Sequence, residues 1–142
     1  MKTSASSRVV LPIEVGPVAI SLDAAAVREV LGPVAVTRLA GGPPALVGVV
    51  PWGGRAIAVL DVSSLVGVEE GLDRPRTVVL DVEGAVVALP VDRVREPRAV
   101  AGERPSHAAR LAFAPLEVDV DGRAHPLLDV GQWVGSLVGA SS

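Results

Sequence analysis

Cysteine is absent from the sequence, which excludes a disulfide framework and thiolate chemistry and fits a reducing compartment. Aromatic residues make up only 2% of the chain, although hydrophobic residues make up 49%. A core must therefore be built from valine, leucine, isoleucine and alanine, and the many valines favour β-strands. Residues 1–7 lack the apolar segment of a signal peptide, so we expect a disordered tail on a cytoplasmic protein.

Long apolar runs are also missing. The longest uncharged stretch, Leu39–Gly54, is shorter than the roughly 20 residues of a spanning helix and contains three prolines and five glycines. We therefore expect strands buried on both faces and no direct membrane insertion. Positive charge is not concentrated, because 13 lysines and arginines are spread among 16 acidic residues for a net charge of −3. This distribution argues against a nucleic acid partner, which needs a clustered basic surface.

Turn residues divide the chain into about ten short strands, which favours two small β-barrels over a doubly wound sheet. The predicted strands are Arg8–Val15, Val18–Leu22, Val34–Leu39, Leu46–Val50, Ala56–Leu60, Arg76–Val82, Ala85–Val91, Leu111–Ala114, Leu116–Val120 and Arg123–Leu128. The clearest helix is predicted over Ala24–Leu31, between an Asp23 cap and a left-handed Gly32. A final helix is predicted from Asp129 to about Val138.

Two sequence motifs occur twice. Ala56–Gly67 (AIAVLDVSSLVG) and Ala124–Gly135 (AHPLLDVGQWVG) match in register at Ala, Leu, Asp, Val, Val and Gly. Val18–Asp23 (VAISLD) and Val87–Asp92 (VALPVD) match at nearly the same spacing and in the same order. The sequence therefore predicts a chain of two similar halves.

No set of side chains with catalytic chemistry stands out. The two histidines, His107 and His125, have no cysteine or second histidine nearby, so we expect solvated or packing side chains rather than a zinc or iron site. The sequence contains no G-x-S-x-G elbow and no glycine-rich phosphate loop. Asp61, Asp92 and Asp129 recur at matching places of the repeat, which favours a capping role. We therefore expect no catalytic residue, metal or cofactor.

The stretch of residues 45–67 organises the chain around the tight corner Pro51–Gly54, which joins two apolar runs. Trp52 lies in this corner, and tryptophan is enriched among binding hot spots. The alternative is that Trp52 fills the space between the two barrels. Trp133 lies on the predicted final helix and is expected to belong to the core.

The order of these pieces resembles the CheW-like domain of bacterial chemotaxis-type signalling. The matching pieces, from about Arg8 to Leu137, are Val18–Asp23, Ala26–Leu31, Val36–Leu39, Leu46–Val50, Ala56–Asp61, Val91–Val94 and Leu127–Val130. No single piece is specific for the family, whereas their order and spacing are.

The resemblance implies a mainly β fold of two intertwined, five-stranded SH3-like barrels with short helices. It implies one domain over residues 8–138, with barrels at about 8–68 and 75–138 and a tail at 139–142. It also implies a non-catalytic adaptor, without a cofactor, between the cytoplasmic domain of chemoreceptors and the regulatory domain of a CheA-type histidine kinase. The candidate protein-binding residues are Val36, Arg38, Gly48, Pro51, Trp52, Gly54 and Arg55.

The corner departs from the pattern of the family, which usually reads N-x-R-G. Here Pro51 and Gly53 replace the asparagine and the arginine, and Gly53 cannot supply the donors of a guanidinium group. Arg55 lies two residues on and, in an extended chain, points to the same side. The chain is interpreted as a divergent adaptor that couples receptor and kinase or, as an accessory member, keeps only one partner. A small-molecule-binding β-barrel module and an enzyme are the alternatives.

Overall fold

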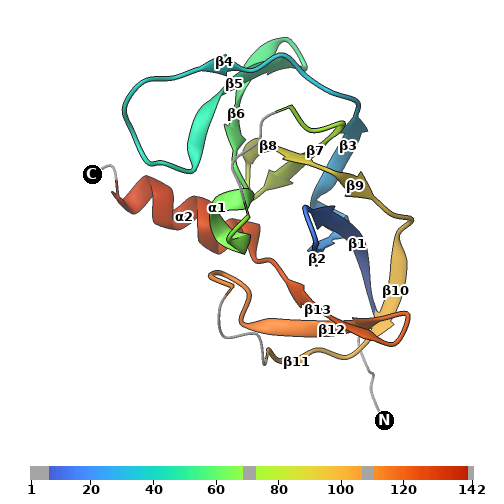
Figure 1. The fold of residues 1–142 in the computed structure, drawn as a ribbon. Coiled ribbons are helices and arrows are strands. Elements are labelled where there is room, and N and C mark those ends of the chain that lie inside the picture. The colour runs from blue at the N-terminus through green and yellow to red at the C-terminus, as the bar shows by residue number, and fades with distance from the viewer. Residues whose placement is uncertain (1–6, 69–72, 107–110, 141–142) are drawn as a thin grey trace.

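The computed structural model describes residues 7–68, 73–106 and 111–140, which form two β-sheets and a few short helices (Figure 1). The strands are β1 (Ser7–Val15), β2 (Val18–Asp23), β3 (Val27–Leu31), β4 (Thr37–Arg38), β5 (Leu46–Trp52), β6 (Arg55–Leu60), β7 (Arg76–Val82), β8 (Ala85–Val91), β9 (Arg93–Val94), β10 (Arg98–Ala101), β11 (Arg104–Pro105), β12 (Leu116–Val120) and β13 (Arg123–Leu127). The helices are η1 (Ala24–Ala26), α1 (Ser63–Val66) and α2 (Val130–Ala140). The predicted mainly β fold is confirmed.

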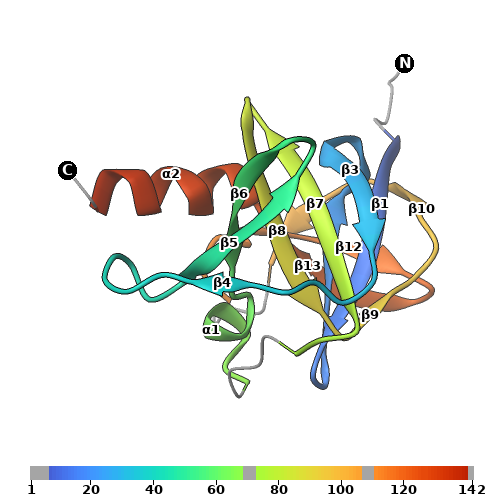
Figure 2. The ribbon, with the colours of Figure 1, turned by 90° about the horizontal axis from the view of Figure 1, so that it is seen from above.

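The two sheets repeat one strand order. The first sheet runs β10-β1-β2-β13-β12-β11, with β9 beside β1, and the second runs β3-β7-β8-β6-β5-β4. Matching positions hold matching parts of the sequence repeat, so that β1–β2 corresponds to β7–β8 and β5–β6 corresponds to β12–β13. Each sheet contains one parallel pair, β2 with β13 and β6 with β8. The halves are intertwined, because each sheet takes strands from both of them (Figure 2).

Each sheet contains five strands of four or more residues, while the described strands β4, β9 and β11 have two residues each. This number agrees with the five strands per barrel that the family resemblance implies. The sheets do not follow the division expected near residues 68–75. Instead, β1 and β2 join β9–β13 of the second half, while β7 and β8 join β3–β6 of the first half.

Most of the hydrophobic core lies between the two sheets. This central cluster combines residues of the first sheet, such as Ile13 and Ile20, with residues of the second, such as Leu80, and with Trp133 of α2. Two smaller clusters lie on the other faces of the two sheets. Along β7, Val79 belongs to the second-sheet cluster although Leu80 belongs to the central one, as expected for successive residues of a strand. Strands buried on both faces explain the short continuous apolar runs of the sequence.

Three predicted hairpins form with the predicted turn residues. β1 and β2 turn at Gly16-Pro17, β7 and β8 at Glu83-Gly84, and β12 and β13 at Asp121-Gly122. In the last two turns, both central residues have positive φ, at 53° and 88° and at 51° and 80°. Two-residue turns of this kind match the right-handed twist of the strands, and Asp-Gly is among their preferred sequences.

The helix predicted over Ala24–Leu31 is wrong. Only the single 3-10 turn η1 forms there, and the Asp23 carboxylate caps it by accepting the Ala25 N–H at 3.0 Å. The remaining residues form β3, which pairs antiparallel with β7. Val27 and Val30 pack against the central cluster from this strand. Pairing with β7 therefore overrides a local preference for helix, at a site where β-branched side chains fit a strand.

Other local predictions also differ from the structure. Gly32 does not have a positive φ. The strand predicted over Val34–Leu39 is reduced to β4, and β9, β10 and β11 were not predicted. The strand predicted over Leu111–Ala114 is a turn, in which Phe113 has a φ of 61°. The Phe113 carbonyl accepts the Asp129 N–H at 2.7 Å, so this turn holds the start of α2.

Two of the three recurring aspartates cap helices, as predicted. An Oδ1 atom of Asp61 accepts the Ser63 N–H at 3.0 Å before α1, and Oδ1 of Asp129 accepts the Gln132 N–H at 3.0 Å in α2. Each bond satisfies a donor that has no partner within its own helix.

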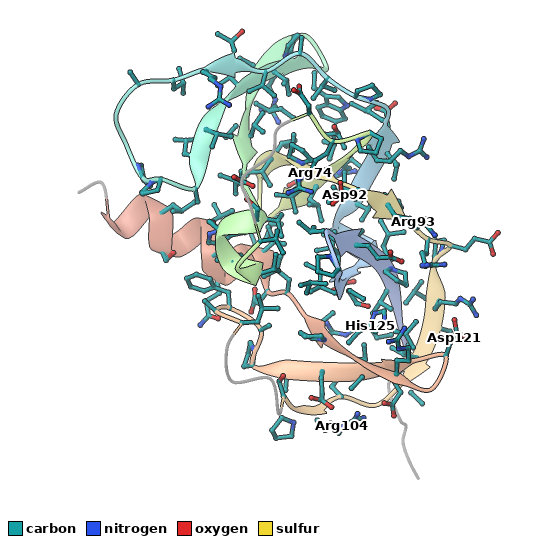
Figure 3. The ribbon with its side chains drawn as sticks, in the orientation of Figure 1. Arg74, Asp92, Arg93, Arg104, Asp121 and His125 are labelled. Carbon is teal, nitrogen blue, oxygen red and sulfur yellow. The ribbon has the colours of Figure 1, made fainter. Side chains whose placement is uncertain are left out.

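The capping role predicted for Asp92 is wrong. Its carboxylate forms an ion pair with Arg74, a side chain that is almost fully buried, and accepts the backbone N–H of Gly16 (Figure 3). Asp92 therefore ties the turn of the β1–β2 hairpin to the chain that enters β7. The reason for the difference is that no helix follows β8, where β9 begins instead.

Gly48 is expected to tolerate no side chain. A Cβ atom at this position would lie only 2.6 Å from Cγ1 of Val36 and closer still to the Thr37 carbonyl, because β4 crosses β5 here. We expect Gly48→Ala to lower the free energy of unfolding by about 2 kcal/mol, the usual cost of overpacking. In the control Gly135→Ala, within α2, the new Cβ meets nothing within 4 Å. It should instead raise stability by up to about 1 kcal/mol. Urea denaturation of both variants tests this difference in sign.

No helix in the described part of the chain is long and apolar enough to cross a membrane.

Candidate protein-interaction surface

The predicted corner is the turn between β5 and β6. Trp52 pairs with Arg55 across it, and Gly53 and Gly54 form the turn with φ values of 60° and 80°. Pro51 and Arg55 are exposed, and Trp52 is half-buried. The expectation that Arg55 points to the same side as residue 53 applies to an extended chain, whereas Gly53 and Gly54 form a turn. Arg55 is instead the first residue of β6, where it pairs with Trp52. We call Pro51–Arg55 the corner.

The indole of Trp52 is fixed in place. Its Nε1–H donates to Oε1 of Glu29 on β3 at 2.9 Å, and its ring packs at the border of the second-sheet cluster. The alternative that Trp52 fills the space between the barrels is wrong, because the tryptophan between the two sheets is Trp133, which is 2% exposed. A rigid, half-buried aromatic ring loses little conformational freedom when a partner binds it.

The other candidate residues lie beside the corner but in different environments. Arg38 of β4 is exposed, as is Gly54. Val36 is half-buried against the second-sheet cluster, and Gly48 is buried beneath β4. The seven residues thus lie on β4, β5 and β6 or directly beside them, with Val36 just before β4 and Gly54 in the turn between β5 and β6. Leu39, next to β4, is 47% exposed and adds apolar area to the same edge of the sheet.

The repeat supplies a second corner for comparison, at the turn between β12 and β13. Ion pairs occupy it, since Nη1 and Nη2 of Arg104 donate to the Asp119 carboxylate at 3.0 and 2.8 Å and Arg98 binds Asp121 at 2.9 Å (Figure 3). The hydrogen bonds from Arg104 lower the pKa of Asp119 below its ordinary value. The equivalent of Trp52 is Val120, which is buried. An exposed apolar corner is therefore a property of one half of the repeat and not of the fold.

An apolar groove between the two sheets was missed by the sequence analysis. It has a volume of about 420 Å³, and its walls include Val27 and Val30 of β3 and Val94 of β9, with Arg76 and Glu96 among its charged residues. The sequence prediction placed Val27 and Val30 on a helix and left Val94 without a strand, so it did not bring them together. Glu29, the partner of Trp52, lies on β3 next to Val30, so one strand links the corner to the groove.

His125 is a packing residue on β13. It is 7% exposed, and its Nδ1 shares a hydrogen bond of 3.1 Å with Oγ of the fully buried Ser21 on β2 (Figure 3). His107 lies outside the described residues. Within residues 7–68, 73–106 and 111–140, no three His, Cys, Asp or Glu side chains are grouped as metal ligands.

Burial lowers the pKa of His125 below its ordinary value, and nearby Arg123 adds to this effect, while Asp121 and Glu14 oppose it. The folded protein therefore binds a proton less readily than the unfolded chain. We expect the free energy of unfolding to fall as the pH drops below about 6.5, with a slope of at most about 1.4 kcal/mol per pH unit for one proton.

Urea titrations between pH 7.5 and 5 test this expectation in a His107→Gln background, which leaves one histidine in the chain. The further change His125→Gln should flatten the profile in this range. An equal slope with and without His125 would contradict the assignment.

These features define a class of protein, namely a mainly β module of two intertwined sheets that presents an apolar corner and an apolar groove. The sequence profile of the CheW-like domain matches residues 10–137. The chain belongs to the CheW-like domain family.

Among solved structures, the chain is similar to the scaffolding protein TtCheW from Thermoanaerobacter tengcongensis. The two share 19% sequence identity and a TM-score of 0.76, over 87% of this chain and 90% of the other. At this identity the likeness supports the shared fold. No match to a curated protein was found.

Proposed function

We propose that the protein is a non-catalytic adaptor of a chemosensory pathway. It acts in the cytoplasm and links the cytoplasmic domain of a chemoreceptor to the regulatory domain of a CheA-type histidine kinase, without a cofactor. The observation that carries this proposal is the difference between the two corners. One corner exposes Pro51 and a fixed Trp52, while its equivalent is closed by the ion pairs of Arg104 and Arg98.

The corner is the proposed contact for the kinase domain. The family resemblance implies that this kinase domain is itself a double barrel related to the chain, and interface cores are enriched in tryptophan and arginine. Arg55 stands at the rim as an exposed cation. It takes over part of the role of the arginine that is missing from the corner, since a guanidinium group binds carboxylates of a partner with directed hydrogen bonds.

The groove is the proposed contact for the receptor tip. We assign an amphipathic helix of the receptor to this groove, because such a helix places its apolar side chains in an apolar groove. Val27, Val30 and Val94 offer such a groove, while Arg76 and Glu96 provide both signs of charge beside it. Separate sites for the two partners are what an adaptor requires.

Charge reversal at the corner tests this assignment. We expect Arg55→Glu to weaken binding of the kinase regulatory domain at least 10-fold. The change replaces a hydrogen-bond donor at the interface by a carboxylate, which repels the negatively charged acceptors of the partner. Binding of the receptor fragment should change less than twofold. The assay is isothermal titration calorimetry with both purified partners.

The repeat offers a matched control. Arg123 follows the Asp121-Gly122 turn and begins β13, as Arg55 follows Gly53-Gly54 and begins β6, and both side chains are exposed. Arg123→Glu should leave both affinities unchanged. Equal losses in the two variants would mean that net charge, and not the corner, determines binding.

A further inference from the structure

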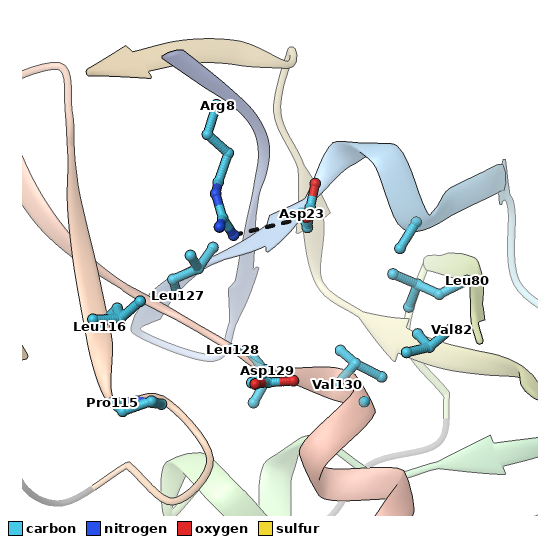
Figure 4. Close-up of a pocket in the computed structure, with 12 residues that line it drawn as sticks. Arg8, Asp23, Leu80, Val82, Pro115, Leu116, Leu127, Leu128, Asp129 and Val130 are labelled. Atoms are coloured by element: carbon cyan, nitrogen blue, oxygen red, sulfur yellow. Dashed lines mark ion pairs between the residues drawn. The ribbon is translucent and has the colours of Figure 1, made fainter. Parts of the chain in front are cut away.

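A second cavity lies between the two sheets, and it shares no lining residue with the groove or the corner (Figure 4). It has a volume of about 310 Å³, within the range of small-molecule sites. Its apolar walls come from both sheets, with Leu80 and Val82 on β7 and Leu116 and Leu127 on β12 and β13. An occupant therefore contacts both sheets.

The charged residues of this cavity are predominantly acidic. Asp23 and Asp129 line it together with Arg8. The Arg8 guanidinium is engaged by Glu103 at 2.8 Å and reaches Asp23 only at 3.7 Å. Two acidic residues and one basic residue therefore line the cavity, and the basic one is already paired with Glu103, so the remaining negative charge favours a cation.

Both aspartates have one oxygen left for an occupant. Oδ1 of Asp23 accepts the Ala25 N–H and Oδ1 of Asp129 accepts the Gln132 N–H, each at 3.0 Å. Oδ2 of Asp23 has the distant Arg8 contact, and Oδ2 of Asp129 has no hydrogen bond within the described part of the chain. Carboxylates that are held by a cap and still expose an oxygen are preorganised acceptors.

The repeat shows that this arrangement is not required by the fold. Asp92 is the sequence equivalent of Asp23, and it is closed on Arg74, whose side chain is 9% exposed. Arg8 is 34% exposed and its pair with Asp23 is loose. The same kind of arginine–aspartate pair is therefore closed in one half and open beside a cavity in the other.

We propose that this cavity binds a small organic cation with an apolar body. The ammonium group binds on the acidic side of the cavity, which the carboxylates of Asp23 and Asp129 line, and the body packs against Leu80, Leu116 and Leu127. The site uses no residue of the corner and is independent of the adaptor function.

The test uses n-hexylammonium chloride as the probe, added to ¹⁵N-labelled full-length protein at about 50 mM salt, where screening is modest. Hexanoate and hexan-1-ol are the controls, because they carry the same chain with a negative and with no charge. We expect saturable chemical-shift changes at the cavity residues with hexylammonium, and binding of hexanoate at least 10-fold weaker. Equal affinity for the two ions, or shifts that do not saturate, would overturn the proposal.

Four variants separate charge from shape. Asp23→Asn and Asp129→Asn keep the capping oxygen and remove one charge each, so each should weaken hexylammonium binding at least fivefold without changing hexan-1-ol binding. Asp121→Asn, an exposed aspartate outside the cavity, should have no effect. Ala26→Leu places a larger side chain in the cavity and should abolish binding while the spectrum stays folded. Unchanged binding in a folded Ala26→Leu variant would show that the probe binds elsewhere.

Discussion

Trp133→Ala is expected to lower the free energy of unfolding by about 4 kcal/mol, within the range for deleting a large buried aromatic side chain. Trp133 is 2% exposed and is among the largest fully buried side chains of the described chain. It belongs to the cluster between the two sheets, so the cavity left by its removal opens at the junction of both halves. Urea denaturation followed by circular dichroism measures the loss.

Gln132→Ala is the control, because Gln132 precedes Trp133 on α2 but is exposed. Its effect should stay within about 0.5 kcal/mol, as for surface substitutions away from special features. Similar stabilities of the two variants would mean that α2 is held by other contacts and that the junction does not depend on Trp133.

Trp52→Ala is expected to weaken binding of the kinase regulatory domain about 30-fold, which corresponds to about 2 kcal/mol at a hot spot. The indole is held half-exposed by its hydrogen bond to Glu29, so the free protein already presents it in one orientation. Trp52→Phe keeps an aromatic ring but removes the N–H, and should lose about half of this energy. Calorimetric titration of the folded variants measures both effects.

Glu29→Gln provides the matched control for this prediction. Its amide oxygen still accepts the hydrogen bond of Trp52, so binding should change less than threefold. Full affinity in the folded Trp52→Ala variant would remove the corner from the interface.

The hairpins were predictable from the sequence because their causes are local. Glu83-Gly84 and Asp121-Gly122 carry the turn chemistry within the turn itself, and the flanking valines favour strands. The caps at Asp61 and Asp129 are local for the same reason. The repeat, seen as two pairs of similar motifs, was enough to indicate two equivalent halves.

What the sequence could not provide depends on pairing between distant segments. β3 forms because β7, which is distant in the sequence, offers a partner, as in the pair of Val27 with Leu80, and no feature of Ala24–Leu31 encodes that partner. The same applies to β9 and β10, which pair with β1.

The candidate site was only partly predictable from the sequence, because one part of it is local and the other depends on strand pairing. Trp52 and its neighbours follow one another in the sequence, so the corner was found from its turn residues. The groove joins β3 to β9 across the two sheets, and both strands were missed. Its sequence signal is weak, since Val27 and Val30 are spaced as on a helix and only the pairing with β7 places them in a strand.

The most direct test of the adaptor function is a pair of titrations with the purified full-length chain, one with the receptor cytoplasmic fragment and one with the kinase regulatory domain. Binding to both is expected, with micromolar dissociation constants and with no competition when both are present. Val30→Glu, in the groove, should weaken only the receptor, and Arg55→Glu, at the corner, only the kinase domain. Binding of neither partner by the folded protein would contradict the adaptor function, and mutual exclusion of the two partners would contradict the separate sites.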